Sequence, residues 1–523
     1  MRMKCISKML VVMLLFVVAI PSFSIETFTE NGFIYKVQRD NCSQFHYNDT
    51  ASLVVIDYMT DSLKDYSTPL HIAASVRHNG RKYSVTRIET GAFRNHAELQ
   101  AVVVDEGIMS IGKEAFDRCI SMKSIYLPAS LSGINGNPFT NCSSLASIVV
   151  DERNENLDSR DGCNAIIAKD DDVLLAACSS ATIPSSVRKI ACRAFDGCNM
   201  MERFVVPEGV ETIESFAFSG CGGMKEISLP ETLKGIDHDA FWGCTSLASI
   251  VIPKNVSDIC FGNIFNGCYN LGSITVDDAN TVYDSRSNCN GIVRKSDSTL
   301  VATCRATVIT NDIRSLDSRC YSGTLIHSLN IPKSLTSIKA DAFSECWEID
   351  DITVESDNAF YCSPSGFNVL LSRDGKTLVL GSRTAAIPDG VEEIGDFAFC
   401  GRYMKSVLDI PKSVKRIGSH AFRDCSVLSD LVMPETVERI GESSFSNCRN
   451  LRSVILSPSL KNVPDYAFSY CHSLSAVVIP KGIETIGNYA FMNCSSLETV
   501  SLPSTAANID REAFAASTKV TKK

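Results

Sequence analysis

The sequence predicts an α/β repeat fold: a solenoid of about fifteen 23-residue rungs with short parallel strands on one side, three hairpin islands and an N-terminal β cap. The first observation is a pattern, A-F-x-x-C-x-x-L-x-x-I-x-L-P-x-x-V-x-x-I-x-x-x, that residues 467–489 and 490–512 both follow. The second is its period, because the signature Phe returns after 23 residues, or after 55 or 56 where a segment is inserted. A fixed period of this length is typical of a solenoid, in which each repeat packs only on its neighbours.

Fifteen copies of the repeat, here called rungs, can be counted from the Phe position. Cys320 is assigned to this position in one rung. Phe occupies it in the others: Phe93, Phe116, Phe139, Phe195, Phe218, Phe241, Phe265, Phe343, Phe399, Phe422, Phe445, Phe468, Phe491 and Phe514.

Alternation within each rung predicts which side chains are buried. In residues 428–433, Leu431 and Met433 are expected to point inward and Val432 outward, as on a short strand. Residues 443–448 are expected to form a short helical or 3₁₀ turn that places Phe445 across the core.

Four segments depart from the repeat. Residues 25–84 are predicted to be a β-rich cap on a solenoid that covers residues 85–523, and Asn79-Gly80 between apolar runs indicates a hairpin there. The islands are three inserted segments that resemble one another, each an apolar run, a polar turn and a second apolar run. They lie near residues 151–182, 277–308 and 355–386.

The start of the chain is predicted to be a signal peptide, residues 1–24. It has three basic residues, an apolar stretch of twelve residues and small residues before the expected cleavage point. Twelve apolar residues are short of the ~20 that a membrane-spanning helix needs. The net charge is −10, or −13 after cleavage, which argues against a nucleic-acid partner. A secreted or bacterial cell-surface protein without a membrane-spanning segment is expected.

The run L-x-x-I-x-L-P, followed by V-x-x-I and A-F-x-x-C, resembles the BspA-like class of leucine-rich repeats over roughly residues 85–514. The resemblance implies a surface protein that takes part in adhesion to host matrix proteins or host cells. It supplies no binding residue, because the repeated motif is structural.

Cysteine occupies eleven of the fifteen equivalent slots, three residues after the Phe position. A spacing of 23 does not suit zinc, so these ladder cysteines are interpreted as small buried side chains with a weak donor. Two further pairs, Cys163 with Cys178 and Cys289 with Cys304, are predicted to form disulfides across the island hairpins. Reduced neighbours are the alternative. The ladder comprises Cys119, Cys142, Cys198, Cys221, Cys244, Cys268, Cys346, Cys425, Cys448, Cys471 and Cys494.

No catalytic, phosphate-binding or metal-binding motif is found in the sequence, so no enzyme, no catalytic residue, no metal and no cofactor is expected. The candidate binding surface is the outward row, defined as the side chain that projects from the strand of each rung. Its proposed protein-binding members are Val103, Tyr126, Val149, Val205, Val251, Val432, Ile455 and Val478. A neighbouring row of mainly small residues is expected to make the face long, flat and weakly polar. An interaction surface and the ordinary strand preference of β-branched residues both explain the row.

These observations predict an adhesin that recognises a host or matrix protein through the solenoid face. A glycan-capture surface protein is the first alternative, although the outward row holds one aromatic side chain, Tyr126. An enzyme with its site in an island is the weaker alternative.

Overall fold

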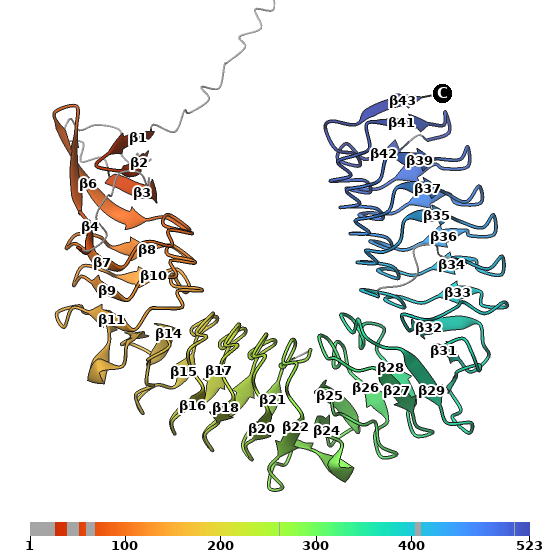
Figure 1. The fold of residues 1–523 in the computed structure, drawn as a ribbon, viewed down its shortest axis with the longest axis horizontal. Helices are drawn as coiled ribbons and strands as arrows, with labels where there is room; N and C mark the ends of the chain where they lie inside the picture. The colour runs from red at the N-terminus through yellow and green to blue at the C-terminus, as the bar shows by residue number, and fades with distance from the viewer. Residues whose placement is uncertain are drawn as a thin grey trace, which may run out of the picture.

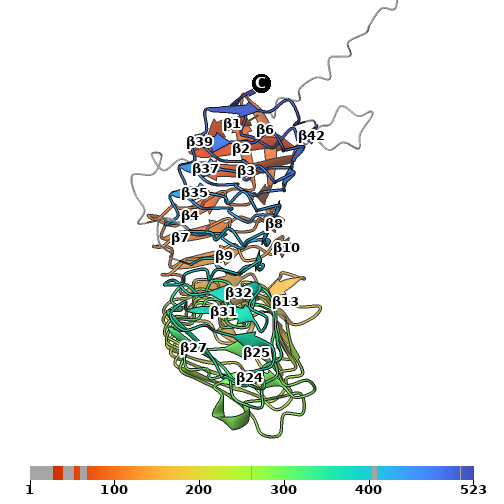
Figure 2. The ribbon, with the colours of Figure 1, turned by 90° about the vertical axis from the view of Figure 1, so that its right-hand side faces the viewer.

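The computed structural model describes residues 27–38, 52–58, 68–260, 262–402, 409–506 and 508–522, so the predicted signal peptide lies outside the described residues. The chain forms one curved solenoid whose rungs follow one another round a horseshoe (Figure 1), and the rungs appear stacked in the view at right angles (Figure 2). It has about 19 turns and almost no helix. The α/β description and the count of fifteen are therefore corrected: the islands and the N-terminal strands pair with the rungs and add turns.

The first strand of each rung comes from the L-x-x-I-x-L run. Neighbouring first strands pair in parallel at an offset of one repeat, as in Ser147 opposite Ser124. Burial alternates as predicted, with Leu431 fully buried and Val432 exposed. The first strands are β7 (Ala101–Val104), β9 (Ser124–Leu127), β11 (Ser147–Val150), β16 (Arg203–Val205), β18 (Glu226–Ser228), β20 (Ser249–Ile252), β22 (Ser273–Val276), β27 (Ser328–Ile331), β29 (Asp351–Val354), β35 (Asp430–Val432), β37 (Ser453–Ile455), β39 (Ala476–Val478) and β41 (Thr499–Leu502), and β43 (Lys519–Lys522) pairs with the last of them.

A second strand, two residues long, ends at the Ile of V-x-x-I, where the sequence predicted no strand. It pairs with its neighbours in parallel, as in Arg416 opposite Arg439. The second strands are β8 (Ser110–Ile111), β10 (Gly133–Ile134), β15 (Lys189–Ile190), β17 (Thr212–Ile213), β19 (Gly235–Ile236), β21 (Asp258–Ile259), β26 (Ser315–Leu316), β28 (Ser337–Ile338), β33 (Glu393–Ile394), β34 (Arg416–Ile417), β36 (Arg439–Ile440), β38 (Asn462–Val463), β40 (Thr485–Ile486) and β42 (Asn508–Ile509).

The segment after the second strand is a series of turns, and the predicted helical turn is wrong. In residues 443–448, Ser443 has φ 53° and Asn447 has φ 60°, values that a right-handed helix does not allow. The Phe445 side chain is nonetheless fully buried, as predicted, and its ring stacks on those of Phe422 and Phe468 at centroid distances of 5.2 and 5.3 Å. Within each series of rungs between islands, such rings form a column through the core.

Tyr321, and not Cys320, occupies the ring position after the second island. Its ring stacks on Phe343 at 5.1 Å, and its N–H donates to the carbonyl of Ala342, as that of Phe93 does to Ala115 and that of Phe195 to Ala217. Cys320 fills the alanine slot immediately before the ring. The sequence assignment was wrong by one residue because this rung is one residue shorter than the repeat.

The ladder cysteines donate hydrogen bonds from one rung to the previous one. The Cys471 thiol lies 3.2 Å from the carbonyl oxygen of Phe445, and the Cys494 thiol lies 3.2 Å from that of Phe468. Burial raises the pKa of Cys119 to about 12. These thiols are therefore neutral, small donors that join neighbouring rungs, as their position in the repeat suggested.

Thiol labelling will test this arrangement. When the folded protein is treated with iodoacetamide at pH 8 and then digested, we expect mass spectrometry to find Cys192 modified first, because it is exposed. Cys260 and Cys362, which are half-buried, should follow more slowly, and the other cysteines of the described ranges should react only after denaturation. Labelling of Cys471 as fast as Cys192 would contradict a closed core.

Each island is a hairpin whose second strand joins the stack. In the first island, β14 pairs with β13 in antiparallel and with β15 in parallel orientation. One face of this hairpin, with Ile166 and Ala176, belongs to the preceding hydrophobic core, and the other, with Ala165 and Leu174, to the following one. The island elements are β12 (Leu157–Asp158), η2 (Arg160–Gly162), β13 (Ala165–Ala168) and β14 (Val173–Ala177); β23 (Tyr283–Asp284), η3 (Arg286–Asn288), β24 (Gly291–Arg294) and β25 (Thr299–Thr303); and β30 (Tyr361–Cys362), β31 (Val369–Ser372) and β32 (Thr377–Gly381).

A buried asparagine fixes each island to the rung before it. Asn154 donates to the carbonyl oxygens of Pro128 and Leu131, at 3.0 and 2.8 Å, and its own oxygen accepts from two N–H groups of the island. Asn280 and Asn358 make the same contacts in the other islands. The signal was present in the sequence, because all three islands carry this Asn three residues before their first strand residue, Leu or Tyr.

The predicted disulfides do not form, and Cys163, Cys178, Cys289 and Cys304 are free thiols. A β-bulge between Ile166 and Ile167 shifts the register by one residue, so that Ala165 lies opposite Ala177. Such a shift moves the side chains beyond it to the other face of the sheet. Cys178 consequently packs in the preceding core and Cys163 in the following one, and the second island repeats this arrangement with Cys304 and Cys289.

The N-terminal segment extends both strand layers. It consists of β1 (Thr27–Glu30), β2 (Phe33–Gln38), β3 (Ser52–Tyr58), β4 (Leu70–Ile72), β5 (Ser75–His78) and β6 (Arg81–Ile88). β6 pairs with β8, β4 pairs with β7, and the predicted hairpin at Asn79-Gly80 joins β5 to β6. The Phe33 ring meets the Phe93 ring edge-on at 6.2 Å. This contact supports the proposal that the segment caps the ring column.

Candidate binding face

The structure places the outward row at exposed positions of the first strands. Val205, Val432 and Val251 are the most open, with 69, 61 and 58% of their surface accessible, and Val103 is half-buried. Tyr126, Val149, Ile455 and Val478 are also exposed. The inward or outward direction that the sequence assigned to these side chains is therefore correct, while their role in binding stays a prediction.

The row forms two continuous apolar runs, and the predicted single long face is interrupted. At one arm of the horseshoe, Val103, Tyr126 and Val149 lie opposite one another in register. At the other arm, Val432, Ile455 and Val478 do the same. Between the arms, β11 and β16 lie in different sheets, as do β22 and β27, because an island intervenes.

The neighbouring row is more polar than predicted. Arg203 and Glu226 occupy it on adjacent strands and form an exposed ion pair at 3.3 Å. Asp430 occupies it on β35, where the Ser453 hydroxyl donates to its carboxylate at 2.6 Å and holds the pKa of that carboxyl below its usual value. The charged residues were missed because the prediction weighed the small members of the row and passed over these positions.

The aromatic member of the row is held in place by an acidic partner. The Tyr126 hydroxyl donates to Asp151 at 2.6 Å, and Arg153 donates to both carboxylate oxygens of Asp151. The bonds from Arg153 and then Tyr126 keep the pKa of Asp151 below its usual range, and the bond to Asp151 raises the pKa of Tyr126. This arm therefore presents an oriented phenol beside a paired carboxylate.

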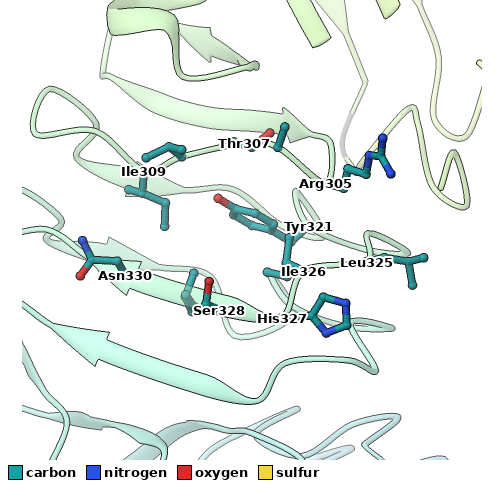
Figure 3. A pocket seen from close by; sticks show the side chains of 12 residues that line it. Arg305, Thr307, Ile309, Tyr321, Leu325, Ile326, His327, Ser328 and Asn330 are labelled. Atoms are coloured by element: carbon teal, nitrogen blue, oxygen red, sulfur yellow. The ribbon is translucent and has the colours of Figure 1, made fainter. Parts of the chain in front are cut away.

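A hollow of about 430 Å³ opens where the second island interrupts the first-strand layer (Figure 3). One wall is the segment that leaves the island, with Arg305, Thr307 and Ile309, and the other is the start of the next rung, with His327 and β27. Tyr321 lies between the walls. Sequence reasoning missed this hollow, because it depends on how the island displaces a strand.

A family model decides the relationship of the chain to known proteins. Residues 80–161, 175–291, 302–369 and 385–521 match the BspA type leucine rich repeat region, in 6 copies. The chain belongs to the BspA-type leucine-rich repeat family. The internal segments between these ranges all fall within the islands, so the islands are where this BspA-type chain departs from the family pattern.

Several solved structures are similar to this chain over most of its length. A leucine rich cell surface protein from Faecalibacterium prausnitzii is 21% identical, with 95% of each chain covered and a TM-score of 0.37. A leucine-rich repeat protein from Bacteroides ovatus is 20% identical, covering 95% of this chain and 99% of that one, with a TM-score of 0.31. The pneumococcal vaccine antigen PcpA is 15% identical with the same coverage and a TM-score of 0.31. No curated protein matches the chain.

Arg402 is a fully buried cation in the core of this BspA-type solenoid. It stands in the Cys slot of the rung after the third island and donates to the carbonyl oxygens of Phe343, Gly381 and Cys400 at 3.1 to 3.3 Å. Desolvation lowers the pKa of its guanidinium. Its bond to Phe343 replaces, across the island, the bond that a ladder cysteine makes to the preceding ring residue.

The remaining chemistry of the described ranges is sparse. Among the residues that the structure describes, no group of three or more His, Cys, Asp or Glu side chains is placed to hold a metal ion. Within the same ranges, no helix has the length and apolar character that crossing a bilayer requires.

Proposed function

We propose that this BspA-type protein is a secreted or cell-surface binding protein, an adhesin that recognises a host or matrix protein through the outward row. The observation that carries the proposal is the in-register apolar run on β35, β37 and β39, Val432, Ile455 and Val478. Contiguous exposed apolar surface of this kind marks interaction sites in soluble proteins. Membership of a repeat family whose solenoids typically bind partners supports the same class of function.

The geometry suits a rigid protein surface. Paired strands lie ~4.8 Å apart, so the three side chains span about 10 Å in a line that the parallel ladder holds fixed. Covering each half-exposed Val or Ile contributes roughly 1 kcal/mol. Little ordering entropy is lost on binding, because the strands are already in place.

Changing the apolar run to a charged one tests the proposal. The double variant Val432→Lys and Val478→Lys is expected to abolish capture of matrix proteins such as fibronectin or fibrinogen in a pull-down, because two ammonium groups would be desolvated at the contact. Its melting temperature should stay within a few degrees of the parent, since both side chains point to solvent.

The matched control adds the same charge to the other strand layer. Asn462→Lys with Asn508→Lys places two lysines on β38 and β42, where both positions are exposed. This control should capture partners normally. Undiminished capture by the Val432 and Val478 variant would remove the outward row from consideration.

Glycan capture is the second candidate, and the oriented Tyr126 hydroxyl with Asp151 is the observation that favours it. A phenol ring can stack on a sugar while the carboxylate accepts from its hydroxyls. A glycan array probed with the parent and with Tyr126→Ala separates the candidates, because signals lost in the variant would favour a sugar ligand. An enzyme with an island site is the weaker reading, since the polar residue that the islands share is engaged in structural bonds.

Export is part of the proposal. Residues 1–24 are proposed as a cleaved signal peptide, and N-terminal sequencing of the mature protein would show the cleavage point. The net charge of −10 disfavours nucleic acid as a partner.

A further inference from the structure

The hollow after the second island has an open strand edge on one side. The N–H of Asp351 donates to the carbonyl of His327 at 3.1 Å, and Ser328 lies opposite Asp351 in the parallel register. In such a ladder, alternate residues direct their main-chain groups to opposite neighbours. Leu329 therefore bonds towards β29, whereas the N–H and C=O groups of Ser328 and Asn330 point the other way, into the hollow.

Nothing in the described chain completes that edge. For β9, by contrast, the first strand β7 occupies the equivalent place. Here the place is taken by residues 305–309, which form no strand, and no main-chain hydrogen bond joins them to Ser328 or Asn330 among the described residues. Unpaired edges of this kind are templates for an added strand.

Tyr321 supplies a buried hydroxyl aimed into the same hollow. It is 1% exposed, and of the ring positions that the structure describes it is the one with a tyrosine. Figure 3 shows its hydroxyl directed towards the end where Ile309 and Asn330 lie. Burial raises the pKa of this phenol well above its ordinary value, so it is a neutral donor, and no described residue accepts its hydrogen bond. An acceptor bound in the hollow would take this hydrogen bond, and one such bond contributes ~1 kcal/mol.

The other end of the hollow is basic. Figure 3 shows Arg305 and His327 there, on opposite walls. No ion pair joins Arg305 to an acidic side chain of the described ranges, while His327 lies 3.7 Å from Asp350. The remaining lining includes apolar side chains, among them Ile309, Ile326 and Leu329.

We propose that this hollow takes an extended segment of a protein partner, which adds as a strand to the edge of β27 and places a carboxylate at Arg305 and a hydrogen-bond acceptor at Tyr321. The volume of about 430 Å³ lies in the range of small-ligand pockets and accommodates a few residues. The inference rests on the proposed protein-binding function and names the chemistry of a second contact. The carboxylate comes either from the C-terminus of the segment or from an acidic side chain.

Fluorescence anisotropy with labelled peptides tests the proposal on the purified full-length chain. The probe is the pentapeptide Val-Thr-Val-Thr-Val with a free carboxyl end, and three companions are its C-terminal amide, an amide with Asp in place of the last Val, and an N-methylated form that lacks N–H donors. We expect the free acid or the Asp amide to bind, which tells the two carboxylate sources apart. The plain amide and the N-methylated form should bind at least ~10-fold more weakly.

Three variants locate the binding. Tyr321→Phe introduces the ring that the other described rungs carry. It should weaken peptide binding about 5-fold without lowering the stability of the protein, since one hydrogen bond contributes ~1 kcal/mol. Arg305→Ala should remove the preference for the acid over the amide. Asn330→Pro removes an N–H from the open edge, a place where proline is tolerated, and should abolish binding while the melting temperature is kept.

Thr353→Pro is the matched control for the edge. Thr353 lies opposite Asn330 on β29 and uses its N–H within the ladder, so its replacement should lower the melting temperature where Asn330→Pro does not. Equal loss of stability in both would overturn the open edge.

Other outcomes overturn the proposal as well. Absence of binding by all the peptides at 1 mM, equal binding of the N-methylated form, or unchanged binding by Tyr321→Phe and Asn330→Pro would each do so. The Val432 and Val478 double variant should bind the peptide normally. If that variant keeps matrix-protein capture while the hollow variants lose peptide binding, the proposal for the outward row is wrong and the proposal for the hollow is supported. If that variant loses matrix-protein capture while the hollow variants keep peptide binding, only the proposal for the hollow is wrong.

Discussion

Replacing Phe445 by alanine is expected to lower the free energy of unfolding by about 3–5 kcal/mol, the usual loss for a fully buried phenylalanine. The ring is fully buried and lies between two parallel neighbours, at interplanar angles of 8° to Phe422 and 3° to Phe468. The backbone ladders on either side of the ring keep the rungs at a fixed spacing. The cavity left by the variant therefore cannot collapse, and both neighbours lose packing.

Thermal and chemical unfolding followed by circular dichroism measure this loss. Phe514→Ala is the matched control, because Phe514 is half-buried and stacks on one described ring, Phe491, at 5.1 Å. Phe514→Ala should lower the free energy of unfolding by less than half as much as Phe445→Ala. In a solenoid each rung depends on its nearest neighbours, so a break in the middle also separates the stack into two weaker parts. Equal losses at the two positions would contradict the ring column as a continuous stabilising element.

Arg402→Ala is expected to lower the free energy of unfolding by about 3–5 kcal/mol, the second large effect. The variant leaves the carbonyl oxygens of Phe343, Gly381 and Cys400 without their donor in a buried site, and each such group costs roughly 1–3 kcal/mol. It also opens a cavity, because the side chain is completely buried. Relief from burying a cation offsets part of this loss.

The variant Arg402→Cys separates the contribution of the hydrogen bonds to stability from the contribution of the buried side-chain volume. Cys198 stands in the same slot after the first island and donates to the carbonyl of Ala177 at 3.7 Å, and Ala177 corresponds to Gly381. A cysteine at 402 should therefore satisfy the Gly381 carbonyl and be more stable than alanine by about 1 kcal/mol. Denaturant titration measures the difference. An alanine variant as stable as the parent would show that the buried charge costs as much as its bonds contribute.

Much of the fold was accessible from the sequence because its information is local and repeated. The period predicted the solenoid, and the alternation in L-x-x-I-x-L predicted that Leu431 is buried and Val432 exposed, which the structure confirms. Asn79-Gly80 predicted its hairpin, since these residues adopt the positive φ values that the turn requires. The membership of the chain in its family follows from the same motif.

The errors arose where a distant neighbour determines the local structure. The two-residue second strands have no strand pattern of their own and exist because the rung before and the rung after offer hydrogen bonds. The bulge in the first island adds one residue to one strand of the hairpin, so that the two faces of the hairpin pack in two different cores and Cys163 is separated from Cys178. Counting residue pairs outward from the turn assumes a regular register and cannot predict this bulge.

The sequence by itself determined the repeat, the direction of the side chains on the first strands and the position of the islands, because those depend on spacing along one strand. The tertiary structure alone decided that Tyr321 and not Cys320 completes the ring column, that Arg402 spans an island, and that β27 keeps an open edge beside a hollow. The physical reason is that each of these depends on which rung lies next in space. An island lengthens the path between two stacked rungs to 55 or 56 residues, and the hydrogen bonds across it, such as the one from Arg402 to Phe343, form between groups that no local pattern connects.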